Sequence, residues 1–223
     1  MLSTSRVVVL LGLIGLSFAV SASNYVGLDY KYRASQGRRA ANYNVRQSMA
    51  KSFSSAEIYA IHRFDNNVGI NVGYEQSANA KRNHTFAANE LFLGNTQNSG
   101  DSSFTRIKIR AGHFDVVGFI DLNDKWEALG QLGVALMQFN IHGYTRVGGV
   151  TTSLAASQTY RFIPRIGLGL QYFPITHFGV RCLLNWEGTN MYRTYVTNDD
   201  GVRMSIRPYT QTASVALGIV GKF

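Results

Sequence analysis

The side chains that could act as nucleophile, general base or metal ligand are few and scattered. The chain holds one cysteine, Cys182, and five histidines: His62, His84, His113, His142 and His177. His113 and Asp115 stand two residues apart, which puts both on one face of a strand, where a carboxylate can orient an imidazole. No serine nucleophile is placed with them, and the cysteine and histidines lack the spacing of a metal site. The sequence therefore predicts no enzyme activity, no cofactor and no metal.

Charged residues give a clearer pattern, because they alternate with apolar ones. In residues 160–173 every second side chain is apolar or aromatic: Tyr160, Phe162, Pro164, Ile166, Leu168, Leu170 and Tyr172. The residues between them are mostly small, polar or basic and include Arg161 and Arg165. Because side chains alternate across a strand, this segment predicts a strand with one apolar and one polar face.

Similar alternation recurs along the chain and predicts eight strands. Their expected ranges are 24–33, 53–64, 68–76, 104–122, 126–144, 160–173, 177–195 and 204–223. The alternation blurs at residues 112–115, where we expect a bulge or an extension beyond the bilayer. Three-residue turns, at 65–67, 123–125 and 174–176, alternate with much longer connections.

This alternation of short turns and long loops is typical of an antiparallel, up-and-down transmembrane β-barrel of the bacterial outer membrane. In such a barrel the apolar faces meet lipid and the charged faces are enclosed. A soluble secreted barrel that binds a small hydrophobic ligand is the alternative, and its apolar faces would point inward.

The inward faces of the eight strands are predicted to carry an ion network. Its expected members are Asp29, Lys31, Glu57, Arg63, Glu75, Arg106, Lys108, Arg110, Glu127, Arg161, Arg165, Arg181 and Glu187. Eight strands leave an interior just wide enough for side chains to fill it, and unpaired charges there would be costly. We therefore expect a polar plug of paired charges, with a narrow small-solute pore as the alternative.

Aromatic residues gather at both ends of the predicted strands, as in the two interfacial belts of a membrane barrel. The set near the short turns is Phe64, Trp126, Tyr172, Phe178 and Phe223, and the set near the long loops is Tyr32, Tyr74, Phe104, Tyr144, Tyr160 and Tyr192. Between the belts the expected lipid-facing residues are apolar.

The first 22 residues are predicted to be a secretory signal, and residues 23–223 one barrel domain. Arg6 precedes the apolar run 7–20, and Val20-Ser21-Ala22 has the small residues of a cleavage site. The whole chain has a formal net charge of +9. An exported chain rarely meets nucleic acid, so anionic lipid headgroups or sugars are the expected partners.

Together these features resemble the small OmpA-type and opacity-type outer-membrane proteins. The likeness is carried by the signal, by PRIGLGLQYFPITHFGVR (164–181) and by SVALGIVGKF (214–223). The final residue, Phe223, resembles the C-terminal assembly signal of such proteins, which implies the barrel-assembly machinery as a partner. The resemblance implies an outer-membrane location and a role in envelope integrity, adhesion or small-solute passage.

Basic residues in the first two long loops suggest an outward contact. They are Arg38, Arg39, Arg46, Lys51, Lys81 and Arg82. Such loops could engage the phosphates of lipopolysaccharide or an acidic host surface ligand, or simply be solvated. The leading prediction is a structural or adhesive barrel, and the alternative from another class is a barrel enzyme that cleaves or transfers lipid acyl chains.

Overall fold

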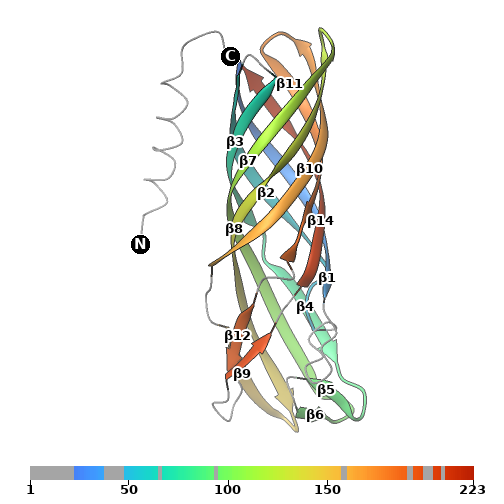
Figure 1. Cartoon of the computed structure of the whole chain (residues 1–223). Coiled ribbons are helices and arrows are strands. Elements are labelled where there is room, and N and C mark those ends of the chain that lie inside the picture. Colours follow the sequence, from blue (N-terminus) through green and yellow to red (C-terminus); the bar gives the residue numbers. More distant parts are fainter. Residues whose placement is uncertain are drawn as a thin grey trace.

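Eight long strands close into an antiparallel barrel in the computed structural model (Figure 1). The structure describes residues 23–37, 48–64, 67–92, 95–156, 160–189, 193–197, 203–206 and 209–223. The barrel strands are β1 (Ser23–Gly37), β2 (Ser52–Arg63), β3 (Val68–Ser77), β7 (Ser102–Asn123), β8 (Trp126–Val147), β10 (Tyr160–Ile175), β11 (Phe178–Glu187) and β14 (Tyr209–Lys222). Each of the eight strands pairs with two others, including β1 with β14 and β7 with β8, so the barrel has no open edge, and the predicted eight-stranded architecture is confirmed.

Two barrel strands continue well past the others at the long-loop end. β7 and β8 each contain 22 residues and pair along nearly their whole length. There β4 (Ala80–Thr85) pairs with β7, and β9 (Val150–Ala156) pairs with β8. The short strands β12 (Thr194–Thr197) and β13 (Arg203–Ile206) extend this sheet, and β5 (Glu90–Phe92) with β6 (Asn95–Gln97) forms a separate hairpin. The sequence predicts loops or the ends of other strands here, so this projecting sheet is an addition to the expected fold.

The apolar faces of the strands point outward, as predicted. On β10 the side chains of Ile166 and Leu168 are 48% and 66% exposed, whereas Arg165 is 2% exposed. Leu217 and Ile219 of β14 are likewise exposed. This orientation contradicts the soluble-barrel alternative, because a continuous outer surface of large apolar side chains belongs in hydrocarbon.

The pairing of β7 with β8 has no register shift here, so of the two outcomes predicted for residues 112–115 the bulge is wrong, whereas an extension beyond the bilayer agrees with the 22-residue length of β7. Their pairing runs residue for residue from Ser102 opposite Arg146 to Asp121 opposite Glu127. What changes is the chemistry of each face: Ile107 is buried and Arg106 is exposed, whereas nearer the short turns Asp115 is buried and Val116 is exposed. The apolar face switches from outside to inside where the outer environment changes from lipid to water.

The interior is stacked in three layers along the barrel axis. Following β7 inward from the long loops, Ile107 and Ile109 lie in one apolar cluster, His113 and Asp115 lie in an ionic layer, and Val117 lies in a second apolar cluster. In the described part of the chain no helix is long and apolar enough to span a membrane.

Candidate functional site

The middle layer of the barrel is a network of buried ion pairs. The Lys31 ammonium lies 2.5 Å from Glu57 Oε2 and 2.9 Å from Glu75 Oε2. Arg33 donates to both oxygens of Glu75, at 2.5 and 2.7 Å, and pairs with Glu187 on its other side. These residues come from β1, β2, β3 and β11, so the network ties strands around the barrel circumference.

A second group of pairs completes the layer. Arg181 Nη2 lies 2.5 Å from Asp29 Oδ2, and its guanidinium stands 3.4 Å from the centroid of the Tyr59 ring. His113 lies between two carboxylates, with Nδ1 2.9 Å from Asp115 Oδ2 and Nε2 3.2 Å from Glu57 Oε1. The crowding here requires small neighbours, because a Cβ added to Gly73 would clash with His113 Nε2.

The described charges of this layer nearly balance. Its five carboxylates are Asp29, Glu57, Glu75, Asp115 and Glu187, and its four permanent cations are Lys31, Arg33, Arg165 and Arg181. Five minus four leaves one negative charge. A nearly neutral, mutually paired cluster is what a low-dielectric interior tolerates.

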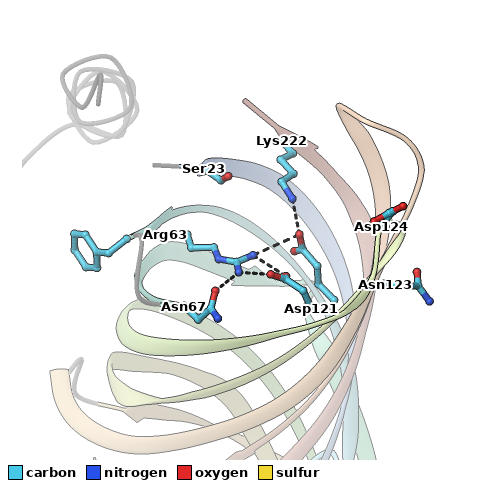
Figure 2. A pocket seen from close by; sticks show the side chains of 9 residues that line it. Ser23, Arg63, Asn67, Asp121, Asn123, Asp124 and Lys222 are labelled. Atoms are coloured by element: carbon cyan, nitrogen blue, oxygen red, sulfur yellow. Dashed lines mark hydrogen bonds and ion pairs between the residues drawn. The ribbon is translucent and has the colours of Figure 1, made fainter. Parts of the chain in front are cut away.

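A polar recess of about 550 Å³ lies at the short-turn mouth of the barrel (Figure 2). Arg63 reaches across this recess to Asp121, at 2.7 and 2.9 Å, and also donates to Asn67. Lys222 Nζ lies 2.5 Å from Glu127 Oε1, and the Tyr25 hydroxyl donates to the same carboxylate. Beneath these pairs the Tyr25 and Phe119 rings stack with centroids 5.6 Å apart. The mouth is therefore bridged by charge pairs over an aromatic layer.

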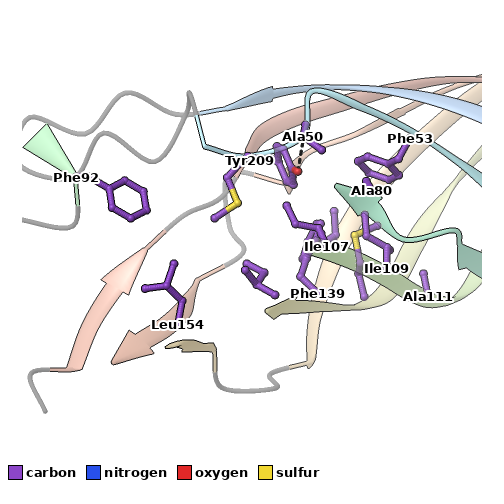
Figure 3. Packing of buried hydrophobic residues seen from close by; sticks show 14 of the residues in the cluster. Ala50, Phe53, Ala80, Phe92, Ile107, Ile109, Ala111, Phe139, Leu154 and Tyr209 are labelled. Carbon is purple, nitrogen blue, oxygen red and sulfur yellow. Dashed lines mark hydrogen bonds between the residues drawn. The ribbon is translucent and has the colours of Figure 1, made fainter. Parts of the chain in front are cut away.

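Apolar side chains fill the long-loop end of the barrel (Figure 3). The Tyr209 ring packs against Phe53 and Phe139, with centroids 6.3 and 5.6 Å away, and its hydroxyl donates to the Ala50 carbonyl at 2.8 Å. Met49, Phe86 and Phe92, which lie outside the barrel strands in sequence, belong to the same buried cluster. The ionic layer is thus covered on both sides.

Most of the predicted network residues point inward, but four do not. Asp29, Lys31, Glu57, Glu75, Glu127, Arg165, Arg181 and Glu187 are buried, and Arg63 lies at the short-turn mouth. The prediction is wrong for Arg106, Lys108, Arg110 and Arg161, whose side chains are exposed or partly exposed. The first three stand on the outward face of β7 beyond the lipid band, and Arg161 is the second residue of β10, at the long-loop rim.

The predicted network omits three of its members. Arg33 lies two residues after Lys31 on the same strand face as Asp29 and Lys31, so the alternation in the sequence does indicate it. His113 and Asp115 share one strand face in the sequence but receive no predicted role, and they are buried in the ionic layer beside Glu57. No cluster of three or more metal-binding side chains occurs among the described residues.

The predicted loop patch and termini are only partly described. Arg38, Arg39 and Arg46 lie outside the described residues, as do the predicted signal 1–22 and Tyr192, while Lys51, Lys81 and Arg82 are exposed. Phe223 exchanges backbone hydrogen bonds with Asn24, at 2.9 and 3.1 Å, so the C-terminal end is joined to the first strand. Its role as an assembly signal stays a prediction.

Solved structures with the same architecture are found among outer-membrane proteins. OprG of Pseudomonas aeruginosa aligns with a TM-score of 0.58 at 10% identity, covering 91% of this chain and 96% of OprG. A major outer-membrane protein of Thermus thermophilus aligns with a TM-score of 0.55 at 12% identity, covering 92% of this chain and 100% of that chain. The chain has the fold of a small outer-membrane β-barrel.

Neisserial surface protein A gives a third match to this barrel, with a TM-score of 0.53 at 13% identity over 92% of this chain and 100% of that chain. No protein-family model and no curated protein matches the sequence. The predicted resemblance to small outer-membrane barrels is confirmed at the level of the fold, and the outward apolar band agrees with the predicted outer-membrane location.

Proposed function

We propose that this barrel is closed and non-enzymatic, and that it serves the structure of the bacterial envelope or interactions at its surface. The observation that carries the proposal is the three-layer interior, in which a paired ionic layer lies between two apolar clusters. Such an interior favours a plug over the narrow-pore alternative, because an ion would have to displace paired charges and pass two apolar layers.

Planar-bilayer recording tests the closed interior. The mature chain, refolded in detergent and added to the bilayer, is expected to give no steady conductance. A matched variant, Phe139→Ala with Tyr209→Ala, removes two rings of the outer apolar cluster and should also stay closed, because it keeps the ionic layer and the second apolar cluster. A porin of known conductance in the same bilayer controls for the sensitivity of the recording. Steady conductance of nanosiemens size from the unaltered chain would overturn the plug and favour the pore.

The same interior argues against the lipid-modifying enzyme. His113 would need access to substrate and a nearby nucleophile, but it is 6% exposed, and its ring nitrogens face Asp115 and Glu57. The test is mass spectrometry of lipid A from cells with and without the protein. We expect identical acyl compositions, and a lost or added acyl chain that depends on the protein would show enzyme activity.

A surface role is favoured by the projecting sheet, since β7 and β8 carry it beyond the lipid band at the long-loop end. The partners that we propose are outer-membrane lipid and lipopolysaccharide, the barrel-assembly machinery during insertion, and a host surface ligand. Binding of intact cells that do or do not display the protein to a host-cell layer tests adhesion, and equal binding would exclude it.

A further inference from the structure

The outward face of β7 changes abruptly from apolar to basic. Phe114 and Val116 face outward within the lipid band, and after Gly112 the next outward residues are Arg110, Lys108 and Arg106. Successive outward residues on a strand lie about 7 Å apart, so the three cations form a ladder roughly 14 Å long. Lys81 on β4 pairs opposite Arg106 and adds a fourth cation at the outer end.

The ladder begins where the lipid-facing surface ends. The outward face of β8 is apolar or small from Trp126 to Leu136, a stretch of roughly 34 Å along the strand. With a strand tilt of about 40°, this gives a band close to the roughly 25 Å expected of outer-membrane barrels. Leu136 pairs opposite Gly112, and one step further out Gln138 pairs opposite Arg110. Arg110 therefore stands in the first row above the hydrocarbon, at the depth of lipid headgroups.

The charges of the ladder are not neutralised within the described protein. The cross-strand neighbours of Arg110 on this face are Gln76 and Gln138, and Lys108 pairs opposite Asn140. None of the ion pairs found among the described residues involves Arg106, Lys108, Arg110 or Lys81. The interior cations Lys31, Arg33, Arg165 and Arg181, in contrast, all have a carboxylate partner.

The geometry points to a binding site for the phosphorylated headgroup of an outer-leaflet lipid, formed by Arg106, Lys108, Arg110 and Lys81. This site deepens the proposed surface role and rests on it, since it requires the long-loop end to face the outer leaflet. Guanidinium groups match the tetrahedral oxygens of phosphate, and a row of cations can contact more than one phosphate of a single headgroup. The continuity of the ladder with the lipid band favours a lipid over a soluble anion.

Lipid A in nanodiscs tests the site directly. The unaltered mature chain and the triple variant Arg106→Gln, Lys108→Gln, Arg110→Gln are compared for binding of fluorescent diphosphorylated lipid A in phosphatidylcholine nanodiscs. Since each basic group near an anionic membrane surface contributes about a fivefold factor, the triple variant should bind roughly a hundredfold more weakly. Lipid A without phosphates should bind the two proteins equally.

A matched control removes the same amount of charge elsewhere. Lys125, Arg161 and Arg193 are exposed and lie off the ladder, so their triple change to Gln should leave lipid A binding unchanged. An equal loss of lipid A binding in both triple variants would show that net charge alone explains the effect, and it would overturn the proposed site. If the ladder variant loses binding to a sulfated oligosaccharide but keeps its binding to lipid A, the lipid site is overturned in favour of a glycan site.

The folding of each variant is checked by the gel-mobility shift on boiling. The closed, non-enzymatic barrel is tested separately by conductance and lipid A composition, so either proposal can fail alone.

Discussion

Replacing Arg33 with Met should strongly destabilise the barrel, because it leaves a buried carboxylate without a partner. Arg33 is the ion-pair partner of Glu187 in the described structure, and Glu187 is 1% exposed. Glu75 would still keep Lys31, 2.9 Å away, so the loss falls mainly on Glu187. Breaking one side of a buried pair costs about 3–5 kcal/mol, which makes this the expected drop in the free energy of unfolding.

The measurement is urea unfolding of the detergent-refolded barrel, followed by tryptophan fluorescence. Trp126 and Trp186 both lie on the outer surface, so their emission reports loss of the lipid or detergent environment. With a urea slope of about 2 kcal/mol per molar, the midpoint should fall by roughly 1.5–2.5 M. Arg161→Met, at an exposed site, should change the free energy of unfolding by about 0.5 kcal/mol or less.

A double variant decides whether the unpaired charge is the cause. Arg33→Met combined with Glu187→Gln removes the orphan carboxylate, and it should recover about 2 kcal/mol or more of the loss. If Arg33→Met costs no more than Arg161→Met, or if the second change recovers nothing, the account of the ionic layer as mutually dependent pairs is refuted.

Three further changes test other layers by the same unfolding measurement. Gly73→Ala forces a Cβ against His113 and should cost about 1–3 kcal/mol, whereas Gly118→Ala, with nothing within 4 Å, should be nearly neutral. Leu168→Arg puts a charge in the middle of the lipid band and should cost about 2–4 kcal/mol; a neutral result would contradict the outward orientation. Phe139→Ala empties part of the outer apolar cluster and should cost about 3–5 kcal/mol, and a loss below about 1 kcal/mol would mean that the cluster is not tightly packed.

The strands and their lipid-facing sides could be predicted from the sequence because only apolar side chains are favourable in contact with the hydrocarbon of the bilayer. Every outward residue between the belts must be apolar, so Ile166, Leu168 and their neighbours alternate strictly with enclosed residues. The ion pairs could not be predicted in the same way. Arg33 and Glu187 are 154 residues apart, and their meeting depends on how the barrel closes, which no local pattern encodes.

The four incorrectly placed cations have a different origin. The prediction places apolar side chains outside and charged side chains inside along the whole length of each strand. Beyond the bilayer the outer surface meets water, so Ile107 and Ile109 turn inward and Arg106 and Lys108 face outward while the strand keeps its phase. Phe104 and Tyr144, predicted in the aromatic belt, instead pair beyond the ladder in the projecting sheet.

The point on β7 where the charged face changes from inward to outward also separates two roles of arginine in this barrel. An arginine inside the barrel is held by a carboxylate on another strand, as Arg181 is by Asp29, and its charge stabilises the closed structure. Arg110 has Gln76 and Gln138 as its cross-strand neighbours, so neither position supplies a carboxylate to pair with it. A cation row without acidic neighbours raises the local positive potential and disfavours close approach of further cations. The phosphates of the outer leaflet supply the missing negative charge at the same depth. We therefore expect the barrel to bind its ligand where the outward face of β7 changes from apolar to basic, and not at the tips of the loops.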